Sequence, residues 1–154
     1  EAAVLCGLGE IGFHGALLTD EFGPFVRTCF ILTDAVIEPT PVKEPHLCDK
    51  CGECAKGCPG KAIADDGHVD PWQCAVYYRG AHKSNPFMDG EFLNDDPERE
   101  NIISGNKHFS REDAREIYKK IKFLPSRTTG YIPCICGKAC DMACYRHLKE
   151  KGVL

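Results

Sequence analysis

The chain has 154 residues, of which 43% are hydrophobic and 27% are charged, as is ordinary for a soluble globular protein. Its formal net charge of −4 argues against a nucleic-acid-binding protein, and no stretch approaches the roughly 20 apolar residues of a membrane-spanning helix. The length suits one domain or one domain with an appendage, and because no signal peptide is evident we expect a cytoplasmic protein.

Residues 1–37 are apolar and rich in glycine, and they contain the run Gly7-Leu-Gly9-Glu-Ile-Gly12. Its G-x-G-x-x-G spacing is typical of dinucleotide-binding folds, but that function also requires a helix that opens at the glycines within a βαβ unit. Further glycines and a proline interrupt the residues that would form this helix. We therefore interpret the glycines as positions that allow tight turns or a close approach of the backbone to another group.

A linker and a cysteine run follow. Residues 38–47 contain three prolines, which favour an extended path. The next residues, Cys48-Asp-Lys-Cys51-Gly-Glu-Cys54-Ala-Lys-Gly-Cys58-Pro, have the C-x₂-C-x₂-C-x₃-C-P spacing of a bacterial 4Fe–4S ferredoxin. The first three thiolates of such a run bind one cubane, and the fourth binds a second. Zinc sites usually contain two separated cysteine pairs, so the spacing indicates iron–sulfur clusters rather than zinc.

The number of cysteines is sufficient for a second cluster, because the chain has 11 cysteines and two 4Fe–4S clusters need about eight. Beyond the run, the candidate ligands are one isolated cysteine and a C-terminal group: Cys74, Cys134, Cys136, Cys140 and Cys144. The step from Cys140 to Cys144 repeats the step from Cys54 to Cys58, which suggests that each segment supplies ligands to both clusters. A disulfide framework would require an oxidising compartment, for which the sequence gives no secretory cue.

These spacings lead to one assignment with one alternative. We assign Cys48, Cys51, Cys54 and Cys144 to the first cluster. We assign Cys58, Cys74, Cys136 and Cys140 to the second cluster. Cys136 is preferred to Cys134 because Cys136 and Cys140 would lie about one helical turn apart, and Cys134 remains the alternative ligand.

The other elements are expected to be helices separated by loops. We expect a short helix from Pro59 to Ala64, a second from Pro71 to Gly80, a third capped by Ser110 and a last one from Lys138 to Lys151. Residues 81–109 are largely polar and are expected to form an irregular insertion. The predicted fold class is α+β: a bacterial ferredoxin-like double-cluster module over residues 48–154, with added helices and irregular loops.

The order of these motifs resembles that in epoxyqueuosine reductases and reductive dehalogenases. The similar positions in the N-terminal segment are Gly7, Gly9, Gly12, Leu17-Leu-Thr19, Phe22-Gly-Pro24, Arg27 and Leu32-Thr-Asp34. Both families continue with the same cysteine run, an isolated cysteine and a final cysteine group, in the order found here. The resemblance extends over most of the chain and is strongest in its first half.

The resemblance implies that the clusters relay electrons to a cobalamin in an upstream catalytic domain. The chain opens at Glu1 without a methionine, so we expect residues 1–37 to be the end of that domain. The residues that would border the cobalamin are Gly7, Gly9, Gly12, Thr19 and Phe22. In these families the residues that protonate the substrate lie in the upstream domain, so we expect no catalytic residue in this chain.

The function expected from the sequence is therefore electron transfer through two 4Fe–4S clusters to a reductase active site. Electrons would enter from a redox partner of the ferredoxin or flavodoxin type. The alternative is a ferredoxin-like carrier subunit that docks on a separate catalytic subunit. Either protein would have a holo form with a net charge of about −8, which favours a basic redox partner over nucleic acid.

Overall fold

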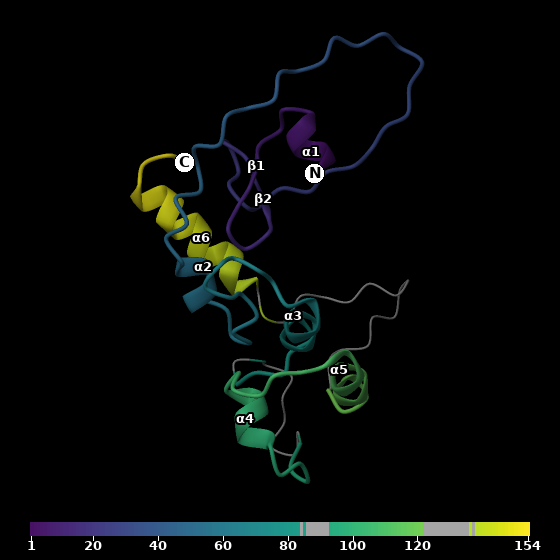
Figure 1. Cartoon of the computed structure of the whole chain (residues 1–154), viewed down its shortest axis with the longest axis vertical. Coiled ribbons are helices and arrows are strands. Elements are labelled where there is room, and N and C mark those ends of the chain that lie inside the picture. Colours follow the sequence, from purple (N-terminus) through teal and green to yellow (C-terminus); the bar gives the residue numbers. More distant parts are fainter. Residues whose placement is uncertain (84, 86–92, 122–135, 137) are drawn as a thin grey trace.

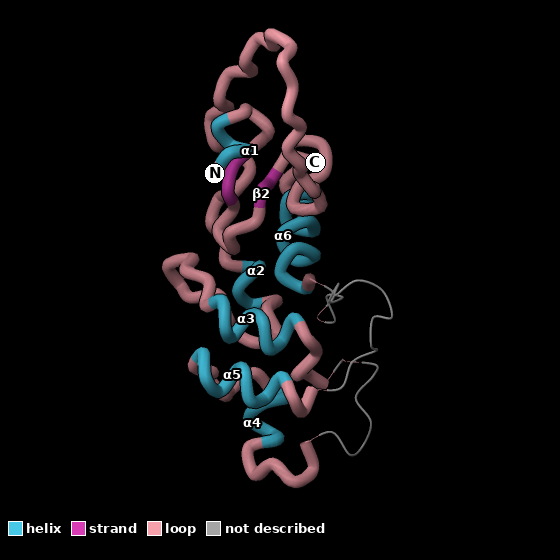
Figure 2. The backbone as a smooth tube through the Cα atoms, turned by 90° about the vertical axis from the view of Figure 1, so that its right-hand side faces the viewer, coloured by secondary structure: helices cyan, strands magenta, loops and turns pink. Residues whose placement is uncertain are grey.

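The computed structural model describes residues 1–83, 85, 93–121, 136 and 138–154. Its elements are α1 (Ala2–Leu5), β1 (Glu10–Ile11), β2 (Leu17–Leu18), α2 (Glu53–Lys56), α3 (Pro71–Tyr78), α4 (Arg99–Ile103), α5 (Arg111–Tyr118) and α6 (Ala139–Glu150). They are arranged along one long axis, with the strands and both termini at one end and α4 and α5 at the other (Figure 1 and Figure 2). Among the described residues, no helix is both long and apolar enough to span a membrane.

The glycine-rich run forms a tight β-hairpin. β1 and β2 pair antiparallel, with Glu10 opposite Leu18. A Cβ atom on Gly9 would lie 1.9 Å from the carbonyl oxygen of Leu18, and one on Gly12 would lie 2.9 Å from the Leu18 side chain. The run therefore enters a strand rather than a helix, and its glycines allow the close backbone approach that the sequence suggested.

The short helix expected from Pro59 to Ala64 is not formed, and that prediction was wrong. The backbone there takes a left-handed residue at Lys61, with a φ of 51°, and Ile63 bridges to Val69. The helix of this region is instead α2, which lies inside the cysteine run. A Cβ atom on Gly60 would lie 2.2 Å from the ring of Tyr77, so this segment packs closely against α3, a contact that local sequence patterns do not indicate.

The three other predicted helices are confirmed, and local capping explains their ends. The Asp70 carboxylate accepts hydrogen bonds from the first backbone N–H groups of α3. Ser110 and Asp113 form a capping box at the start of α5. α6 is followed by Gly152, whose φ of 71° is typical of the residue that terminates a helix.

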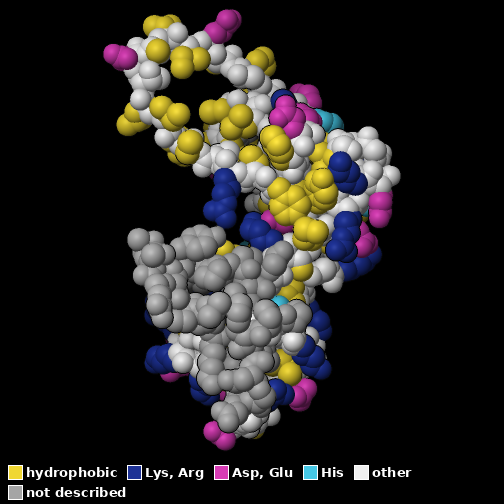
Figure 3. Space-filling model, turned by 180° about the vertical axis from the view of Figure 1, so that it is seen from behind, with side chains coloured by type: hydrophobic (Ala, Val, Ile, Leu, Met, Phe, Trp, Pro, Cys, Tyr) yellow, Lys and Arg dark blue, Asp and Glu magenta, His cyan; other side chains and the backbone are white. Residues whose placement is uncertain are grey.

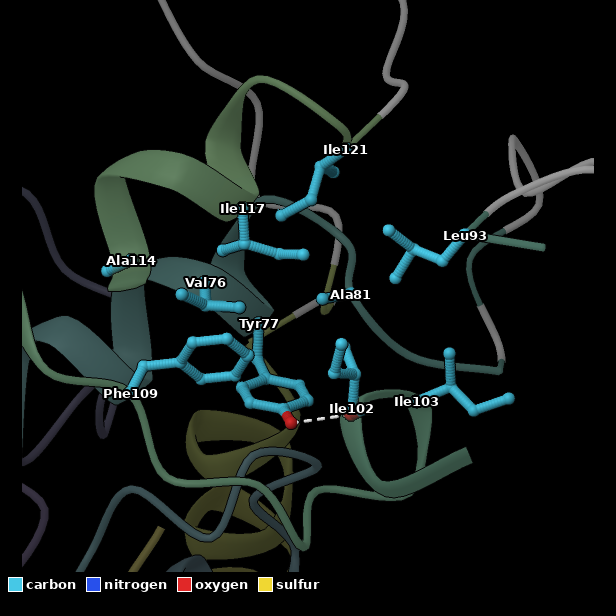
Figure 4. Close-up of a cluster of buried hydrophobic side chains, with 10 residues drawn as sticks. All are labelled: Val76, Tyr77, Ala81, Leu93, Ile102, Ile103, Phe109, Ala114, Ile117 and Ile121. Carbon is cyan, nitrogen blue, oxygen red and sulfur yellow. Dashed lines mark hydrogen bonds between the residues drawn. The ribbon is translucent and has the colours of Figure 1, made fainter. Parts of the chain in front are cut away.

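One of the two hydrophobic cores contains no cysteine and is called the thiol-free core (Figure 4). Its buried residues are Val76, Tyr77, Ala81, Leu93, Ile102, Ile103, Phe109, Ala114, Ile117 and Ile121. Half of these residues come from residues 81–109, which also contain α4. The described part of this segment is irregular apart from α4, as predicted, but its apolar residues are buried in a core, which its polar composition did not indicate.

The other core, called the thiol core, lies where α2 packs against α6. Its buried residues are Leu18, Leu47, Cys54, Ile63, Cys144 and Leu148. The partly buried residues that pack against them include Cys48, Cys58 and Cys140. Cysteine thus makes up much of the interior that surrounds the predicted clusters.

Between the hairpin and the cysteine run, the chain forms a long loop without helix or strand, which includes the proline-rich residues 38–46. Its apolar side chains face solvent, and Leu32 is 98% exposed. Figure 3 shows hydrophobic side chains along this projecting loop. The loop brings the chain from the hairpin to Cys48 without any regular element of its own.

Candidate metal centre

The four cysteines predicted for the first cluster line one cavity. Cys48 and Cys51 reach it from the loop before α2, Cys54 from α2, and Cys144 from α6. Cys54 and Cys144 are buried, whereas Cys51 is exposed. The structure therefore brings together thiols that are up to 96 positions apart in the sequence.

The protonation of these thiols reflects their crowding. Burial, followed by the nearby thiols of Cys54, Cys48 and Cys51, raises the pKa of Cys144 to about 12. Burial also raises the pKa of Cys54. Without a cation the buried thiols stay protonated, so metal binding here must release protons. A set of desolvated sulfur donors suits a soft metal ion or an iron–sulfur cluster.

The β-hairpin covers one side of this cavity through Phe13 and His14. The backbone N–H of Phe13 donates a hydrogen bond to Sγ of Cys48 over 3.2 Å. The carboxylate of Glu10 accepts hydrogen bonds from three consecutive N–H groups, those of His46 (2.5 Å), Leu47 (3.0 Å) and Cys48 (2.7 Å). The hairpin thus holds the first cysteine at both its backbone and its sulfur.

Sequence reasoning missed the role of Glu10, although one signal was present. Glu10 is the only Asp, Glu, Lys or Arg between Ala2 and Thr19, in a stretch that is otherwise apolar and glycine-rich. Burial acts to raise its pKa, but the N–H donors of the cysteine loop outweigh burial, and the pKa of Glu10 lies below its usual value. Glu10 is therefore a buried carboxylate stabilised by backbone donors.

A second contact ties the cysteine loop to α6. The Asp49 carboxylate pairs with Nε2 of His147 over 2.9 Å and with Nζ of Lys151 over 3.1 Å. The hydrogen bond from His147 contributes most to a pKa of Asp49 far below its usual value. One ligand atom each of Asp49, Cys51 and His147 lie within 4.8 Å of one another. This trio is the only group of that kind among the residues that the structure describes.

A buried histidine–carboxylate pair connects the hairpin with α6 between the two cysteine groups. Nε2 of His14 lies 3.1 Å from Oδ1 of Asp141, and Nζ of Lys138 lies 2.6 Å from Oδ2. Burial acts to raise the pKa of Asp141, but the hydrogen bonds from His14 and Lys138 hold it below its usual value. Asp141 follows Cys140 directly, and Sγ of Cys140 donates to it over 3.6 Å.

Three of the cysteines predicted for the second cluster lie near one another. Burial raises the pKa of Cys140 to about 12, and the thiols of Cys58 and Cys136 contribute to that increase. Cys136 precedes α6 rather than belonging to it, because Lys138 takes a left-handed conformation with a φ of 49°. The reason given for preferring Cys136, one helical turn, was therefore wrong, although Cys136 approaches Cys140. Cys134 lies outside the described residues.

Cys74, the remaining predicted ligand, lies on α3 and is half-buried. It lines a surface hollow with Tyr78 and Arg79. Burial, and to a smaller extent the thiol of Cys74, raises the pKa of Tyr118 on α5. Cys74 therefore lies at the boundary between α3 and α5.

The predicted cobalamin-side residues lie on and beside the hairpin. A Cβ atom on Gly7 would lie 2.3 Å from the carbonyl oxygen of Pro41. Contacts within the chain therefore already explain why this position and those of the hairpin are glycine. Thr19 bridges to Gly23, and its hydroxyl accepts a hydrogen bond from the N–H of Phe22 over 3.3 Å. Phe22 is exposed. Contact of these residues with a cobalamin stays a prediction.

The convergence of buried thiols from two distant segments defines a cysteine-rich metal-binding module. In a comparison with known proteins, the chain is similar to oxidoreductases. Tetrachloroethene reductive dehalogenase of Dehalobacter restrictus is 36% identical over 80 residues, which are 48% of this chain and 14% of that protein. The tetrachloroethene reductive dehalogenase of Sulfurospirillum multivorans is 38% identical over 66 residues, or 41% of this chain and 13% of that protein.

Epoxyqueuosine reductases are also similar to the chain. The one from Listeria monocytogenes is 30% identical over 87 residues, which are 56% of this chain and 22% of that protein. These homologues confirm the family resemblance inferred from the motifs. The chain spans less than a quarter of the length of these relatives. No family model and no solved structure matches the chain.

Proposed function

We propose that this chain is an iron–sulfur electron-transfer module that relays electrons through two 4Fe–4S clusters to a reductase active site. The observation that carries the proposal is the single cavity lined by Cys48, Cys51, Cys54 and Cys144. These are the four thiols that the ferredoxin spacing and the crossed arrangement assign to one cubane. When bound, such a cluster supplies reversible one-electron transfer.

The separation of the thiols favours a cluster over a single zinc ion. A tetrahedral zinc ion with Zn–S bonds of about 2.3 Å would hold its thiolates about 3.8 Å apart. In the described part of the chain, no three cysteines bring their sulfur atoms within 4.8 Å of one another. The described thiols are therefore less tightly grouped than the ligands of a single tetrahedral zinc ion, which favours a larger cofactor.

The second cluster would be held by Cys58, Cys74, Cys140 and Cys136, with Cys134 as the alternative to Cys136. One backbone donor is present at each site, since the N–H of Phe13 faces Sγ of Cys48 and the N–H of Ala62 faces Sγ of Cys58 over 3.4 Å. Hydrogen bonds to cysteine sulfur stabilise the more negative, reduced form of a cluster and so raise its potential.

The helix pair α2 and α6 would keep the two clusters adjacent. Cys140 and Cys144 lie four residues apart on α6, which corresponds to about 6 Å along the helix axis. Cys54 and Cys58 show the same spacing in the cysteine run, and α2 packs directly on α6. Each site would then take ligands from both segments, so an electron could pass between clusters without leaving the protein interior.

The electron acceptor is proposed from the relatives. They are reductases several times longer than the matched segment, so we propose that the reducing site lies outside these residues and holds a cobalamin in an upstream domain. The electron donor would be a protein of the ferredoxin or flavodoxin type. In the alternative, the chain is a carrier that docks on a separate catalytic subunit.

The test is the content of iron, sulfide, zinc and cobalt in anaerobically purified full-length protein, with EPR spectra after dithionite reduction. We expect about eight iron and eight sulfide per chain and the signals of two interacting cubanes. Zinc without sulfide would contradict the proposal, and about four iron would restrict it to one cluster. One cobalt per chain would support the cobalamin acceptor, whereas iron without cobalt would favour the carrier subunit.

A further inference from the structure

We propose that Glu10 is a positioning residue that fixes the first cysteine site in its binding geometry before the metal arrives. The inference rests on the proposed function for the identity of the cluster, but the contact itself is a property of the polypeptide. Glu10 is only 6% exposed, and its side chain bonds to residues 36 to 38 positions further along the chain.

The geometry of the contact requires a carboxylate. Oε2 accepts the N–H groups of His46 and Leu47, and Oε1 accepts that of Cys48. Two acceptor oxygens therefore serve three consecutive donors. A glutamine would present one oxygen and one NH₂ group, and the NH₂ group would face a backbone donor. Leaving a buried N–H unpaired is unfavourable, so the loop would shift.

Other described contacts also hold this loop, since Leu47 is buried in the thiol core and Asp49 pairs with His147 and Lys151. Glu10 differs from them because it accepts the backbone N–H of Cys48 itself. The loop that precedes Cys48 has no helix or strand up to His46. Glu10, in contrast, belongs to β1 and lies opposite the fully buried Leu18. The same hairpin provides the N–H of Phe13 for Sγ of Cys48. The β-hairpin thus positions the first predicted ligand of an otherwise irregular segment.

Electrostatics also indicates a positioning role. Four thiolates and a cluster at this site would carry net negative charge, and a buried carboxylate nearby would oppose its formation. Glu10 therefore does not help to bind the cluster through its charge. Its contribution lies in the three hydrogen bonds, which are charge-assisted and stronger than those of a neutral acceptor.

Asp20 provides a matched control. Its carboxylate holds the same loop, but through side chains, namely Nζ of Lys43 over 2.5 Å and Nε2 of His46 over 2.8 Å. It is only half-buried, whereas Glu10 is buried. Asp20→Asn removes the same unit of charge from the same region, and it leaves the backbone donors of Leu47 and Cys48 paired.

The experiment compares the full chain with its Glu10→Gln and Asp20→Asn variants after loading with iron and sulfide. We expect Glu10→Gln to release about half of its iron to a chelator at least about ten-fold faster, as the loss of one charge-assisted hydrogen bond implies. The reduction potential of one cluster should shift while that of the other stays. Asp20→Asn should match the unmodified chain in both measurements.

A second measurement uses the unmodified chain and does not depend on whether a variant folds. In the iron-free protein, the backbone amides of residues 46–48 should be protected from hydrogen exchange, because Glu10 binds them without metal. Free exchange of these amides would overturn the proposal. The proposal would also be overturned if Glu10→Gln released iron at the rate of the unmodified chain and kept its reduction potentials. A uniform acceleration of the release of all iron would overturn it as well. A native chain that binds zinc without sulfide would refute the proposed function, and the amide measurement would still decide the role of Glu10.

Discussion

The two hydrophobic cores of this protein are built from different chemistry. The thiol-free core joins α3, α4 and α5 through aliphatic and aromatic side chains, with an edge-on contact between Tyr77 and Phe109. The thiol core joins the hairpin, α2 and α6, and several of its interior side chains are cysteines. Hydrocarbon side chains bury stably by themselves, whereas thiols that are predicted ligands reach their final state only with metal bound. We therefore expect only the thiol core to depend on bound metal for its stability.

The largest expected effect comes from removing the metal. In the loaded protein, a cofactor present at a thousand-fold excess over its Kd would contribute about 4 kcal/mol, so its removal should lower the unfolding temperature of the thiol core by about 15 °C or more. The thiol-free core should keep its unfolding temperature. Calorimetry of loaded and iron-free protein measures both transitions, and an equal decrease in both would show that the cores are not independent.

A matched pair of core substitutions separates stability from metal retention. Leu148 in the thiol core is 1% exposed and Ile117 in the thiol-free core is 5% exposed. Truncating either residue to alanine should cost about 2–5 kcal/mol of unfolding free energy. Leu148→Ala should also accelerate iron release, because Leu148 lines the first cysteine cavity. Ile117→Ala should leave iron release unchanged.

Denaturant titration and chelator kinetics measure these two effects. The exposed Arg115 lies on the same helix as Ile117, so Arg115→Ala serves as the control. It should change the unfolding free energy by no more than a few tenths of a kcal/mol and leave the rate of iron release unchanged. Faster iron release in Ile117→Ala would show that the thiol-free core supports the metal site directly.

A smaller effect is expected at Tyr77, which is buried in the thiol-free core. Its hydroxyl donates to the carbonyl oxygen of Ile102 over 2.5 Å, as Figure 4 shows. Tyr77→Phe should therefore cost about 1 kcal/mol. Burial, with a smaller contribution from Cys58, raises the pKa of Tyr77 from 10.0 to about 12.

The raised pKa of Tyr77 also gives a pH dependence with a defined sign. Between pH 10 and about 12 the unfolded chain can ionise this residue and the folded chain cannot, so stability should fall as the pH rises through this range. Denaturant titrations across this range should show a smaller decrease for Tyr77→Phe. Identical slopes for the two proteins would contradict the assignment.

How far the sequence could predict the molecule depended on the distance between interacting residues. The Ser110 cap and the termination of α6 at Gly152 are local and were predicted correctly. The cysteine spacing indicated the first site, although the cavity needs Cys144 from the other end of the chain. Local patterns do not reveal that Tyr77 packs on Gly60, in the segment where a helix was expected.

The same reason explains the residues that were missed. Glu10 binds backbone groups 36 to 38 positions away, and backbone donors leave no signature in a sequence. The apolar residues Leu93, Ile102 and Ile103 lie in a polar stretch, so their common burial follows only from the packing of α4. Long-range contacts of this kind form the thiol-free core, and they also hold the hairpin against the first cysteine cavity.

The proposed role of α6, which would supply one ligand to each of two clusters, can be tested by EPR of dithionite-reduced protein carrying single cysteine substitutions. Cys144→Ser should alter the same signal as Cys54→Ser, because these thiols share one cavity. Cys140→Ser should instead alter the signal that Cys58→Ser alters, because these two thiols lie together. If Cys144→Ser altered the signal of the Cys58 site and left that of the Cys54 site unchanged, the crossed arrangement of the two clusters would be wrong.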